Sequence, residues 1–373
     1  MTGESSPVVV LAGGGTGGHV FPMIAVADAL RAEADVRVVF VGTGRGMETK
    51  LVPARGEQLE LLDVLPIKGK GVWGALRGAT RAARTLPSAR RLATRLGARA
   101  VLAVGGYASG PMALGAWTAG VPVAILAPDV VLGLTNRWLL PFARRAYVAF
   151  TPTERRIGQG RALRTGVPLR GAFRPAPYVP EAGRFSVLVL GGSLGATALN
   201  DLVPRALAGA ARSVAGLSVL HQTGDGRQDE VAARYRDLGL IDRARVLPFL
   251  DDVATELTRA DLVIGRAGAS SVAELCAVGR AAILIPFPVV RVHQAENAQA
   301  LVAVGAALCI AQTDATVPRL EQEIVALAHD GERRARMADA ARHEGRPDAA
   351  REIARDLLAL ARGTRSSGKG AHV

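Results

Sequence analysis

A histidine follows a run of glycines in LAGGGTGGHVFP, residues 11–22, where five of the six residues before His19 are glycine. Glycine loses more backbone entropy on folding than any other residue, so such a run after an apolar strand needs a reason. A strand that ends in glycines and opens a helix presents unpaired N–H groups and the positive end of the helix dipole to an anion. We therefore expect a diphosphate close to this backbone, with His19 placed to take a proton from a neighbouring hydroxyl. The alternative is that His19 only donates a hydrogen bond or caps the turn.

Two further segments have the same form, GGYASGP at 105–111 and GGSLGA at 191–196, and each follows an apolar strand. Close packing of a strand on a helix explains many single glycine turns, but three of them favour a phosphate-bearing ligand. None ends in the Lys-Ser/Thr pair of a P-loop, and VRVVFVGTG (36–44) closes without the acidic residue of a nicotinamide-binding fingerprint. A sugar nucleotide is therefore favoured over ATP or a nicotinamide dinucleotide.

The second half carries a carboxylate and two amides beside such turns. Glu274 lies in GRAGASSVAEL (265–275), and Gln294 and Asn297 lie in IPFPVVRVHQAENAQAL (285–301). A glutamate near a helix start usually complements the dipole, yet a sugar nucleotide also needs a carboxylate for its ribose hydroxyls. Amide side chains supply the paired donors and acceptors that hexose hydroxyls require, although ordinary helix capping explains them too.

Short β-branched runs alternate with helical patterns along the whole chain, which predicts parallel sheets and a doubly wound α/β fold. The expected strands are VVVLA (8–12), VRVVFVG (36–42), AVLAVGG (100–106), VPVAILA (121–127), FSVLVL (185–190), LSVLHQ, ARVLPFL, ADLVIGRAG and AAILIPF. Four prolines between 166 and 184 rule out a helix or central strand there, so this segment is expected to be a linker. We expect an N-terminal domain over 1–165, a C-terminal domain over 185–345, a helix over 346–362 that returns to the first domain, and a disordered tail over 363–373.

The composition of the 373 residues suits two domains, because 49% of them are apolar. Cys276 and Cys309 lie in apolar stretches without metal-ligand spacing, so both are expected to be buried free thiols. The N-terminus lacks the features of a signal peptide, and no apolar run reaches the length of a membrane span. A cytoplasmic protein is expected.

The net charge of +13 is concentrated in residues 64–153, where twelve Lys and Arg accompany one acidic residue, Asp129. Such a field attracts polyanions. The stretches LPIKGKGVWGALRGATRAAR (65–84) and NRWLLPFARR (136–145) mix aromatic and aliphatic residues with cations, the composition of an interfacial membrane element. In the second stretch the expected contacts are Trp138, Leu139, Phe142, Arg144 and Arg145. A nucleic-acid-binding module is rejected, because no base-stacking aromatics interleave the arginines.

The motifs together resemble the MurG family, glycosyltransferase family 28. In chain order they are GGGTGGHVFP, GGYASGP, GLTNRWL, GVPLR, GGSLGATALN, PFLDD, RAGASSVAEL and HQAENA, and they span nearly the whole chain. The resemblance implies a GT-B fold with two Rossmann-like domains facing across a cleft. It also implies transfer of N-acetylglucosamine from UDP-N-acetylglucosamine to the 4-hydroxyl of the muramoyl sugar of undecaprenyl-linked lipid I, giving lipid II for peptidoglycan. The transfer would invert the anomeric carbon without a metal or cofactor, at the cytoplasmic face of the membrane.

The resemblance also assigns roles to residues. Glu274 would bind the ribose, Leu250 and Arg266 would lie near the uracil, Ser193 and Gly195 would hold the donor diphosphate, and Arg170 would close on the nucleotide. Gln294 and Asn297 would meet the sugar hydroxyls. The full implied donor set is Thr16, Gly17, Gly18, Arg170, Ser193, Gly195, Leu250, Arg266, Glu274, Gln294 and Asn297. The implied acceptor set is Gly14, Tyr107, Ser109 and Asn136, with His19 facing the acceptor as the candidate base.

One stretch departs from the family pattern. Where the family carries His-Glu-Gln-Asn before GLTN, this chain has Leu126, Ala127, Pro128 and Asp129. Asp129 could be the catalytic base or could orient His19, the acceptor could differ from lipid I, or the backbone alone could do the work. The rival functions are a GT-B transferase with another lipid acceptor and a UDP-N-acetylglucosamine 2-epimerase. Asp251 and Asp252 are expected to cap a helix rather than to bind a metal.

Overall fold

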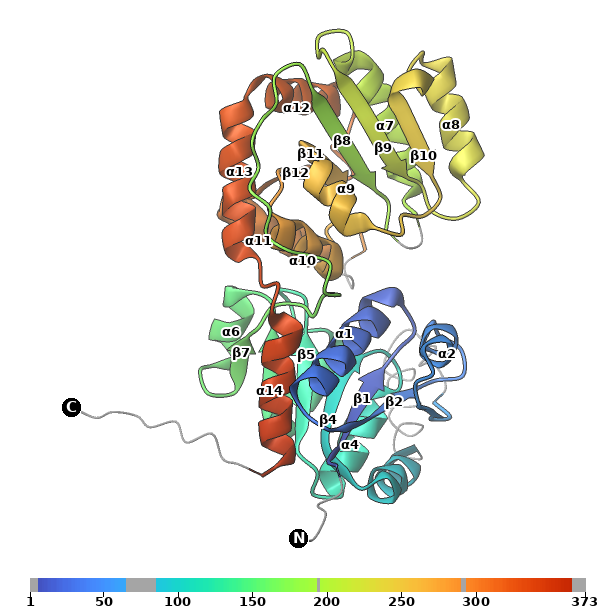
Figure 1. The fold of residues 1–373 in the computed structure, drawn as a ribbon, viewed down its shortest axis with the longest axis vertical. Helices are drawn as coiled ribbons and strands as arrows, with labels where there is room; N and C mark the ends of the chain where they lie inside the picture. Colours follow the sequence, from blue (N-terminus) through green and yellow to red (C-terminus); the bar gives the residue numbers. More distant parts are fainter. Residues whose placement is uncertain (1–5, 65–84, 193–194, 290–292, 364–373) are drawn as a thin grey trace, which may run out of the picture. The chain divides into compact units, whose positions relative to one another are not determined.

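The computed structural model describes residues 6–64, 85–192, 195–289 and 293–363. The chain divides into two compact units, residues 1–170 with 348–373 and residues 171–347 (Figure 1). We call them unit 1 and unit 2. The chain thus passes between the units twice, once after Arg170 and once before Asp348.

Unit 1 contains a parallel sheet of seven strands in the order β3-β2-β1-β4-β5-β6-β7. Their bounds are β1 Val8–Gly13, β2 Arg37–Gly42, β3 Leu59–Leu61, β4 Ala98–Gly105, β5 Val123–Ala127, β6 Arg145–Val148 and β7 Ala162–Arg164. The helices are α1 Gly17–Glu33, α2 Glu48–Leu51, α4 Ser109–Thr118, α5 Leu134–Leu139, α6 Thr151–Ile157 and α14 Ala349–Ala361, with 3-10 turns η1 Pro53–Arg55 and η2 Leu140–Phe142. Residues 85–96 are also helical.

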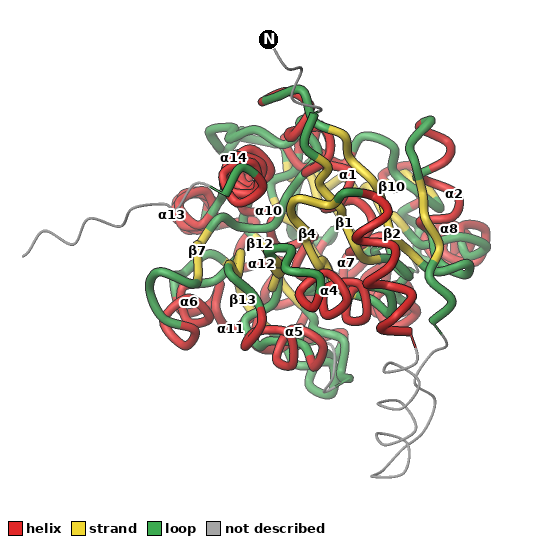
Figure 2. The backbone as a smooth tube through the Cα atoms, turned by 90° about the horizontal axis from the view of Figure 1, so that it is seen from below, coloured by secondary structure: helices red, strands yellow, loops and turns green. Residues whose placement is uncertain are grey.

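Each face of this sheet has its own hydrophobic core. Alternate residues of β1 and β4 point to opposite faces, so Val9 and Leu11 pack with α1 and α14, whereas Val8 and Val10 pack with α4 and the helical residues 85–96. Figure 2 shows α14 and α4 on opposite sides of β4. The last helix is fixed to unit 1 by charge as well, because Asp356 pairs with Arg145 (3.2 Å) and accepts a hydrogen bond from the Tyr147 hydroxyl (2.8 Å).

Unit 2 repeats the architecture with a parallel sheet of six strands in the order β10-β9-β8-β11-β12-β13. The strands are β8 Phe185–Leu190, β9 Leu217–Gln222, β10 Ala244–Leu247, β11 Leu262–Gly265, β12 Ala282–Leu284 and β13 Ala307–Cys309. The helices are α7 Thr197–Ala210, α8 Gln228–Asp237, α9 Val253–Arg259, α10 Ala269–Val278, α11 Gln294–Ala303, α12 Val317–His329 and α13 Gly331–Glu344, with the 3-10 turn η3 Ile241–Arg243. When the strands of each unit are counted from its own first strand, both sheets contain the order 3-2-1-4-5-6, which is that of a doubly wound fold.

The predicted α/β fold class is confirmed, and each of the nine expected strands coincides with a strand of the structure. No helix or strand lies between 166 and 184. The short strands β3, β6, β7 and β13 were not predicted. Asp252 caps α9 by accepting a hydrogen bond from the Thr255 N–H (3.0 Å), as predicted. Cys276 is buried, but Cys309 is only half-buried, so the expectation of two buried thiols was wrong for Cys309.

Candidate functional site

In a doubly wound sheet, ligands bind beyond the carboxyl ends of the strands where the strand order reverses. That point lies between β1 and β4 in unit 1 and between β8 and β11 in unit 2. All the glycine turns that the sequence singled out lie at these two points, because they follow β1, β4, β8 and β11 directly. At the helices that open there, α1, α4, α7 and α10, the N-cap residue makes no side-chain capping hydrogen bond. Both units thus carry a glycine-lined edge at which helices begin without a cap from that residue.

The turn after β1 already holds an anion, and it belongs to the chain itself. The Gly15 N–H donates to Glu48 Oε2 at 2.7 Å, and the Thr43 N–H and hydroxyl each donate to Glu48 Oε1 at 3.1 Å. Glu48 is buried, with 1% of its surface exposed. The carboxylate occupies one of the amides that the sequence assigned to a diphosphate, and it fills the space that the missing side chain of Gly14 leaves.

The turn after β4 interlocks with the turn after β1. A Cβ on Gly106 would overlap the carbonyl oxygen of Gly14, and one on Gly105 would lie 2.8 Å from His19 Nε2. Both glycines have positive φ, 119° at Gly105 and 85° at Gly106. Protein atoms therefore require these glycines in unit 1, whereas Gly15, with φ 93°, has open space above it.

His19 lies at the centre of this interlocked pair of turns. Its Nδ1 is 3.0 Å from the Gly14 carbonyl oxygen, which can only accept, so Nδ1 carries the proton and Nε2 is the basic atom. Burial lowers the pKa of His19 below its ordinary value, while its hydrogen bond to Gly14 and the charges of Asp129 and Glu48 act in the opposite direction. A neutral imidazole with Nε2 unprotonated is the form that a general base requires.

The departure from the family pattern falls on two buried residues, Leu126 and Ala127, and two half-buried ones, Pro128 and Asp129. Leu126 and Ala127 end β5 inside the two cores of unit 1, so their side chains cannot meet a ligand. The Leu126 backbone carbonyl accepts a hydrogen bond from Asn136 Nδ2 at 2.7 Å. Asn136 is 7% exposed, and its Oδ1 is buried without a hydrogen-bond partner among the described residues. Asp129 is half-buried and its charge acts on His19.

The other unit 1 residues of the implied site differ in their exposure. Thr16 and Gly18 are exposed at the start of α1, whereas Gly17 is buried. The Ser109 hydroxyl is fully buried and donates to the Gly106 carbonyl at 3.0 Å, so it holds the second turn. The Arg170 guanidinium stacks on the Phe21 ring at 4.8 Å.

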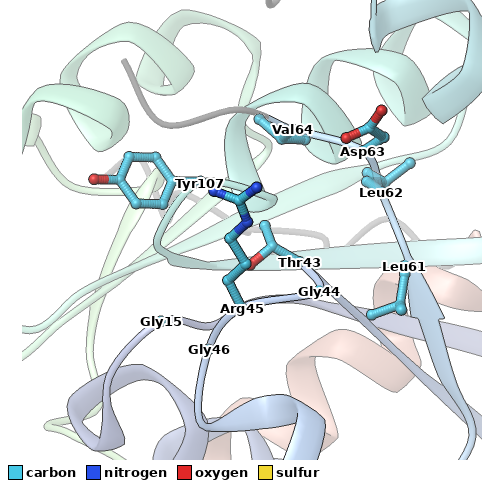
Figure 3. Close-up of a pocket in the computed structure, with 10 residues that line it drawn as sticks. All are labelled: Gly15, Thr43, Gly44, Arg45, Gly46, Leu61, Leu62, Asp63, Val64 and Tyr107. Atoms are coloured by element: carbon cyan, nitrogen blue, oxygen red, sulfur yellow. The ribbon is translucent and has the colours of Figure 1, made fainter. Parts of the chain in front are cut away.

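A cavity of about 360 Å³ opens beside the first turn. Its lining residues are Gly15, Thr43, Gly44, Arg45, Gly46, Leu61, Leu62, Asp63, Val64 and Tyr107. Figure 3 shows the Arg45 guanidinium extending into it from the 43–46 loop, between Tyr107 and Asp63. Tyr107 is 50% exposed, so of the implied acceptor residues it is one that a ligand in this cavity could touch.

In unit 2, an uncharged amide side chain forms hydrogen bonds to the turn after β8. Gln222 Nε2 donates to the carbonyls of Gly192 (3.0 Å) and Pro248 (3.1 Å), which ties the turn to the loop that contains Leu250. A Cβ on Gly195, at φ 70°, would overlap the Thr223 carbonyl oxygen. Leu250 is buried, and Ser193 lies outside the described residues.

A buried chain of hydrogen bonds supports that Thr223 carbonyl. Tyr235 donates to His221 Nδ1 (2.9 Å), His221 Nε2 donates to Asn200 Oδ1 (3.1 Å), and Asn200 Nδ2 donates to the Thr223 oxygen (2.9 Å). The chain must run from Tyr235 to Thr223, because the Asn200 oxygen and the Thr223 carbonyl can only accept. With His221 neutral, its Nε2 then carries the proton and its Nδ1 accepts. Burial lowers the pKa of His221 to about 3, so it stays neutral at physiological pH.

The turn after β11 is held on both sides of one residue, Ala267. Gln294 Oε1 accepts from the N–H groups of Ala267 (3.2 Å) and Phe287 (3.0 Å), and Asn297 Nδ2 donates to the Ala267 carbonyl (3.1 Å). Asn297 is fully buried, so the amide holds the turn rather than reaching a ligand in this structure.

Two charged residues follow the same turn. Arg266 Nη1 donates to the Ile285 carbonyl (2.8 Å), and its guanidinium lies 5.5 Å from the centre of the Phe287 ring. Glu274 is half-buried on α10, five residues after the helix begins at Ala269. Arg266 thus follows the end of β11 directly, and Glu274 lies in the second turn of the helix that opens after it.

His293 is a further residue of interest that was not in the implied site. It precedes α11 with φ 52°, an uncommon backbone conformation for a residue other than glycine, and its Nδ1 is buried without a hydrogen-bond partner in the described part of the chain. Strained residues of this kind persist where the surroundings fix them, often at binding sites.

The expected membrane face is described only in part. Residues 65–84 lie outside the described residues. In the second stretch, Leu134 and Trp138 are 67% and 62% exposed, and Phe142 stacks on Trp117 with ring centres 4.8 Å apart. Two expected contacts were wrong: Leu139 is buried in the core, and Arg145 is engaged by Asp356.

Among the described residues, no group of three or more His, Cys, Asp or Glu is arranged to hold a metal ion, and no helix there is long and apolar enough to cross a membrane.

Sequence reasoning missed Glu48, although the spacing of Gly42, Gly46 and Glu48 after a strand was a usable signal. It also missed the chain through His221 and Asn200, whose residues lie on three separate elements.

Comparisons with known proteins agree over nearly the whole chain. Residues 9–148 match the glycosyltransferase family 28 N-terminal domain, and residues 186–353 match its C-terminal domain. A protein of Sorangium cellulosum (strain So ce56) is 57% identical over 96% of this chain and 89% of its own length. One of Acidithiobacillus ferrooxidans (strain ATCC 53993 / BNL-5-31) is 41% identical over 95% and 98%. Both are named UDP-N-acetylglucosamine–N-acetylmuramyl-(pentapeptide) pyrophosphoryl-undecaprenol N-acetylglucosamine transferase.

Among solved structures, the crystal structure of MurG from Acinetobacter baumannii is similar with a TM-score of 0.81 and 31% sequence identity. The similarity covers 94% of this chain and 99% of that one.

Proposed function

Since the chain belongs to glycosyltransferase family 28, we propose that it transfers N-acetylglucosamine from UDP-N-acetylglucosamine to the muramoyl 4-hydroxyl of undecaprenyl-linked lipid I. The product is lipid II, the precursor of peptidoglycan. The observation that carries this proposal is the identity of 57% over 96% of the chain to a transferase named for that reaction. The site geometry then suggests how the two units divide the work.

Unit 2 binds the donor in this proposal. Glu274 accepts hydrogen bonds from the ribose hydroxyls, and Leu250 and Arg266 lie towards the uracil. The turn at Ser193 and Gly195 offers its amides and the free N-terminus of α7 to the diphosphate. Gln294 and Asn297 fix the Ala267 turn, so Gln294 Nε2 is the amide group left to meet a sugar hydroxyl.

Unit 1 binds the acceptor and supplies the base. His19 Nε2 takes the proton of the muramoyl 4-hydroxyl as that oxygen attacks the anomeric carbon, and the UDP leaves from the opposite face with inversion. Asp129 favours the protonated imidazole that forms. Gly14, Tyr107, Ser109 and Asn136 shape the acceptor side, with Tyr107 in direct contact and Ser109 acting through the Gly106 carbonyl.

Stabilisation of the leaving UDP requires positive potential at its diphosphate. Preoriented amides and helix N-termini supply such potential without reorganisation during the reaction. We propose that the turns after β8 and β11 do this without a metal ion.

The lipid-linked acceptor brings the enzyme to the cytoplasmic face of the cell membrane as a peripheral protein. Leu134, Trp138 and Phe142 expose apolar surface beside Arg137 and Arg144, a mixture suited to an anionic lipid surface. Each such cation contributes on the order of 1 kcal/mol near an anionic leaflet.

The experiment is transfer of labelled N-acetylglucosamine from its UDP donor to a short-chain lipid I analogue, with EDTA present and with Mg²⁺ present. Equal formation of the labelled disaccharide product in both supports the full proposal. Product formation only with Mg²⁺ would reject the metal-independent step alone. No transfer, with release of an epimerised sugar nucleotide, would indicate the epimerase. Transfer only to another lipid would indicate a different acceptor.

A further inference from the structure

The buried Glu48 has a site built around it. Three glycines from two segments surround its carboxylate: Gly14 after β1, and Gly42 and Gly46 between the end of β2 and the start of α2. A Cβ on Gly14 or Gly46 would overlap the carboxylate, and one on Gly42 would lie 2.6 Å from the Glu48 Cγ. Glycine thus recurs at each place where a side chain would displace this single group.

The carboxylate is also fully engaged by donors. Gly15 binds one oxygen, and the Thr43 N–H and hydroxyl bind the other. These three bonds join the first glycine turn to the 42–48 segment. Gly15 and Glu48 are 33 residues apart along the chain. The bond from Gly15 has the short length of a charge-assisted hydrogen bond, and the two from Thr43 have ordinary lengths, so three bonds hold one carboxylate between the two segments.

From the geometry we infer that Glu48 is a positioning residue for the transfer reaction, because its carboxylate holds the first glycine turn in the shape that the acceptor requires. The inference rests on the proposed function. Glu48 binds Gly15, and the neighbouring Gly14 carbonyl accepts the hydrogen bond that sets the tautomer of His19. A change at Glu48 therefore moves the base without touching the donor turns of unit 2.

The same bonds shape the cavity beside the turn. Gly15, Thr43 and the two residues that flank Arg45 line it, so Glu48 fixes the loop from which the Arg45 guanidinium extends (Figure 3). While Glu48 holds the Gly15 N–H, this amide is not available to a ligand phosphate. An anionic group of the acceptor in the cavity would meet Arg45 instead.

The test compares four variants with the wild-type enzyme in the transfer assay. Glu48→Gln keeps the size but places an NH₂ group against an N–H donor, and Glu48→Ala empties the site. Thr43→Val removes one hydrogen bond. The matched control is Glu57→Gln, the same chemical change in the ion pair with Arg31, in which the Glu57 side chain is 13% exposed. The readouts are kcat/KM for the lipid I analogue, the Kd for UDP, and the midpoint of thermal unfolding.

We expect kcat/KM for the acceptor to fall at least tenfold in Glu48→Gln and less in Thr43→Val, with the Kd for UDP within twofold of wild type. Formate, which supplies a carboxylate alone, should restore part of the activity of Glu48→Ala and none to Glu48→Gln. Glu57→Gln should match the wild type.

Acceptor kinetics within twofold of wild type in Glu48→Gln would overturn the inference, as would an equal loss of UDP binding. Should neither Glu48 variant fold, Thr43→Val decides, and an unchanged kcat/KM there overturns it. An inactive wild-type enzyme would instead overturn the proposed function, so the two failures are distinguishable.

Discussion

The glycine turns of the two units look alike in sequence but are held by different chemistry. In unit 1, titratable side chains occupy the space beside two of the glycines, the Glu48 carboxylate at Gly14 and the His19 imidazole at Gly105, while the Gly14 carbonyl lies at Gly106. In unit 2, backbone carbonyls take that place, as the Thr223 oxygen does at Gly195, and the supporting side chains are amides.

The difference bears on what each edge can bind. An amide satisfies backbone groups without adding charge, so the positive potential of the α7 and α10 N-termini remains available to a diphosphate. In unit 1 the first turn already carries a negative charge, and a histidine with a lowered pKa stands beside it. The same strand–turn–helix pattern thus suits anion binding in unit 2 and proton transfer in unit 1.

The sharpest test of this division is His19→Ala. We expect kcat to fall by about 10²–10⁴, the usual contribution of a positioned base, with the Kd for UDP within twofold of wild type. Transfer kinetics and calorimetric titration with UDP measure the two effects. His343→Ala, at an exposed histidine, is the control. A loss of UDP binding equal to the loss of kcat would contradict the division.

Asp129→Asn separates the two candidate bases. If His19 is the base, kcat/KM falls as the pH drops through a pKa that lies below 6.5, and removing the Asp129 charge moves this limb to still lower pH. Activity should then survive in Asp129→Asn. Collapse of activity in Asp129→Asn at every pH, with His19→Ala retaining it, would assign the base to Asp129.

Two glycines with similar φ, one in each unit, test whether neighbouring atoms or backbone conformation make glycine necessary in the turns. Gly106 (φ 85°) has the Gly14 carbonyl against it, whereas the described residues place nothing within 4 Å of a Cβ on Gly192 (φ 77°). We expect Gly106→Ala to destabilise unit 1 by roughly 3 kcal/mol or more, and Gly192→Ala to cost about 1 kcal/mol, the strain of a positive φ alone. Urea unfolding measures both. Equal costs would show that conformation rather than neighbours sets the need for glycine.

For Glu274→Gln we expect UDP binding to weaken tenfold to a hundredfold, or about 1.4–2.8 kcal/mol, since hydrogen bonds to a charged group are lost. The readout is the Kd for UDP, with Glu256→Gln on α9 as a control of the same chemical change in an exposed ion pair. The acid limb of the pH profile of kcat/KM should stay where it is in the wild-type enzyme. A Kd like that of the wild type would remove Glu274 from the ribose site.

Acid should weaken unit 2 through His221. Its pKa is about 3 when folded and about 6.5 when unfolded, so the unfolded state binds more protons between these values. Stability is complete above about pH 6.5 and falls towards pH 3 by up to about 1.4 kcal/mol per pH unit. Hydrogen exchange of β9 at several pH values measures this loss, and it should disappear in His221→Gln. A slope that His221→Gln leaves unchanged would place the titrating group elsewhere.

The fold was predictable because alternating strand and helix patterns determine a doubly wound sheet, and the glycine turns and Glu274 fell where the pattern put them. What could not be predicted was which way a polar side chain faces. Asn297 and Ser109 have the residue types of a ligand site, yet both are buried and hold turns. Glu48 was missed because its role depends on the Gly15 N–H, which lies 33 residues away along the chain, and the local spacing of Gly42, Gly46 and Glu48 gives only its contacts near Thr43.

The return of α14 to unit 1 bears on how the protein is made. Unit 2 is continuous in the chain, but the core between the sheet of unit 1 and α1 also needs Ile353, Leu357 and Ala361 of α14. During synthesis, unit 2 is therefore complete before unit 1, although unit 1 emerges from the ribosome first. The nascent unit 1 must wait, with apolar surface uncovered, until α14 has been translated.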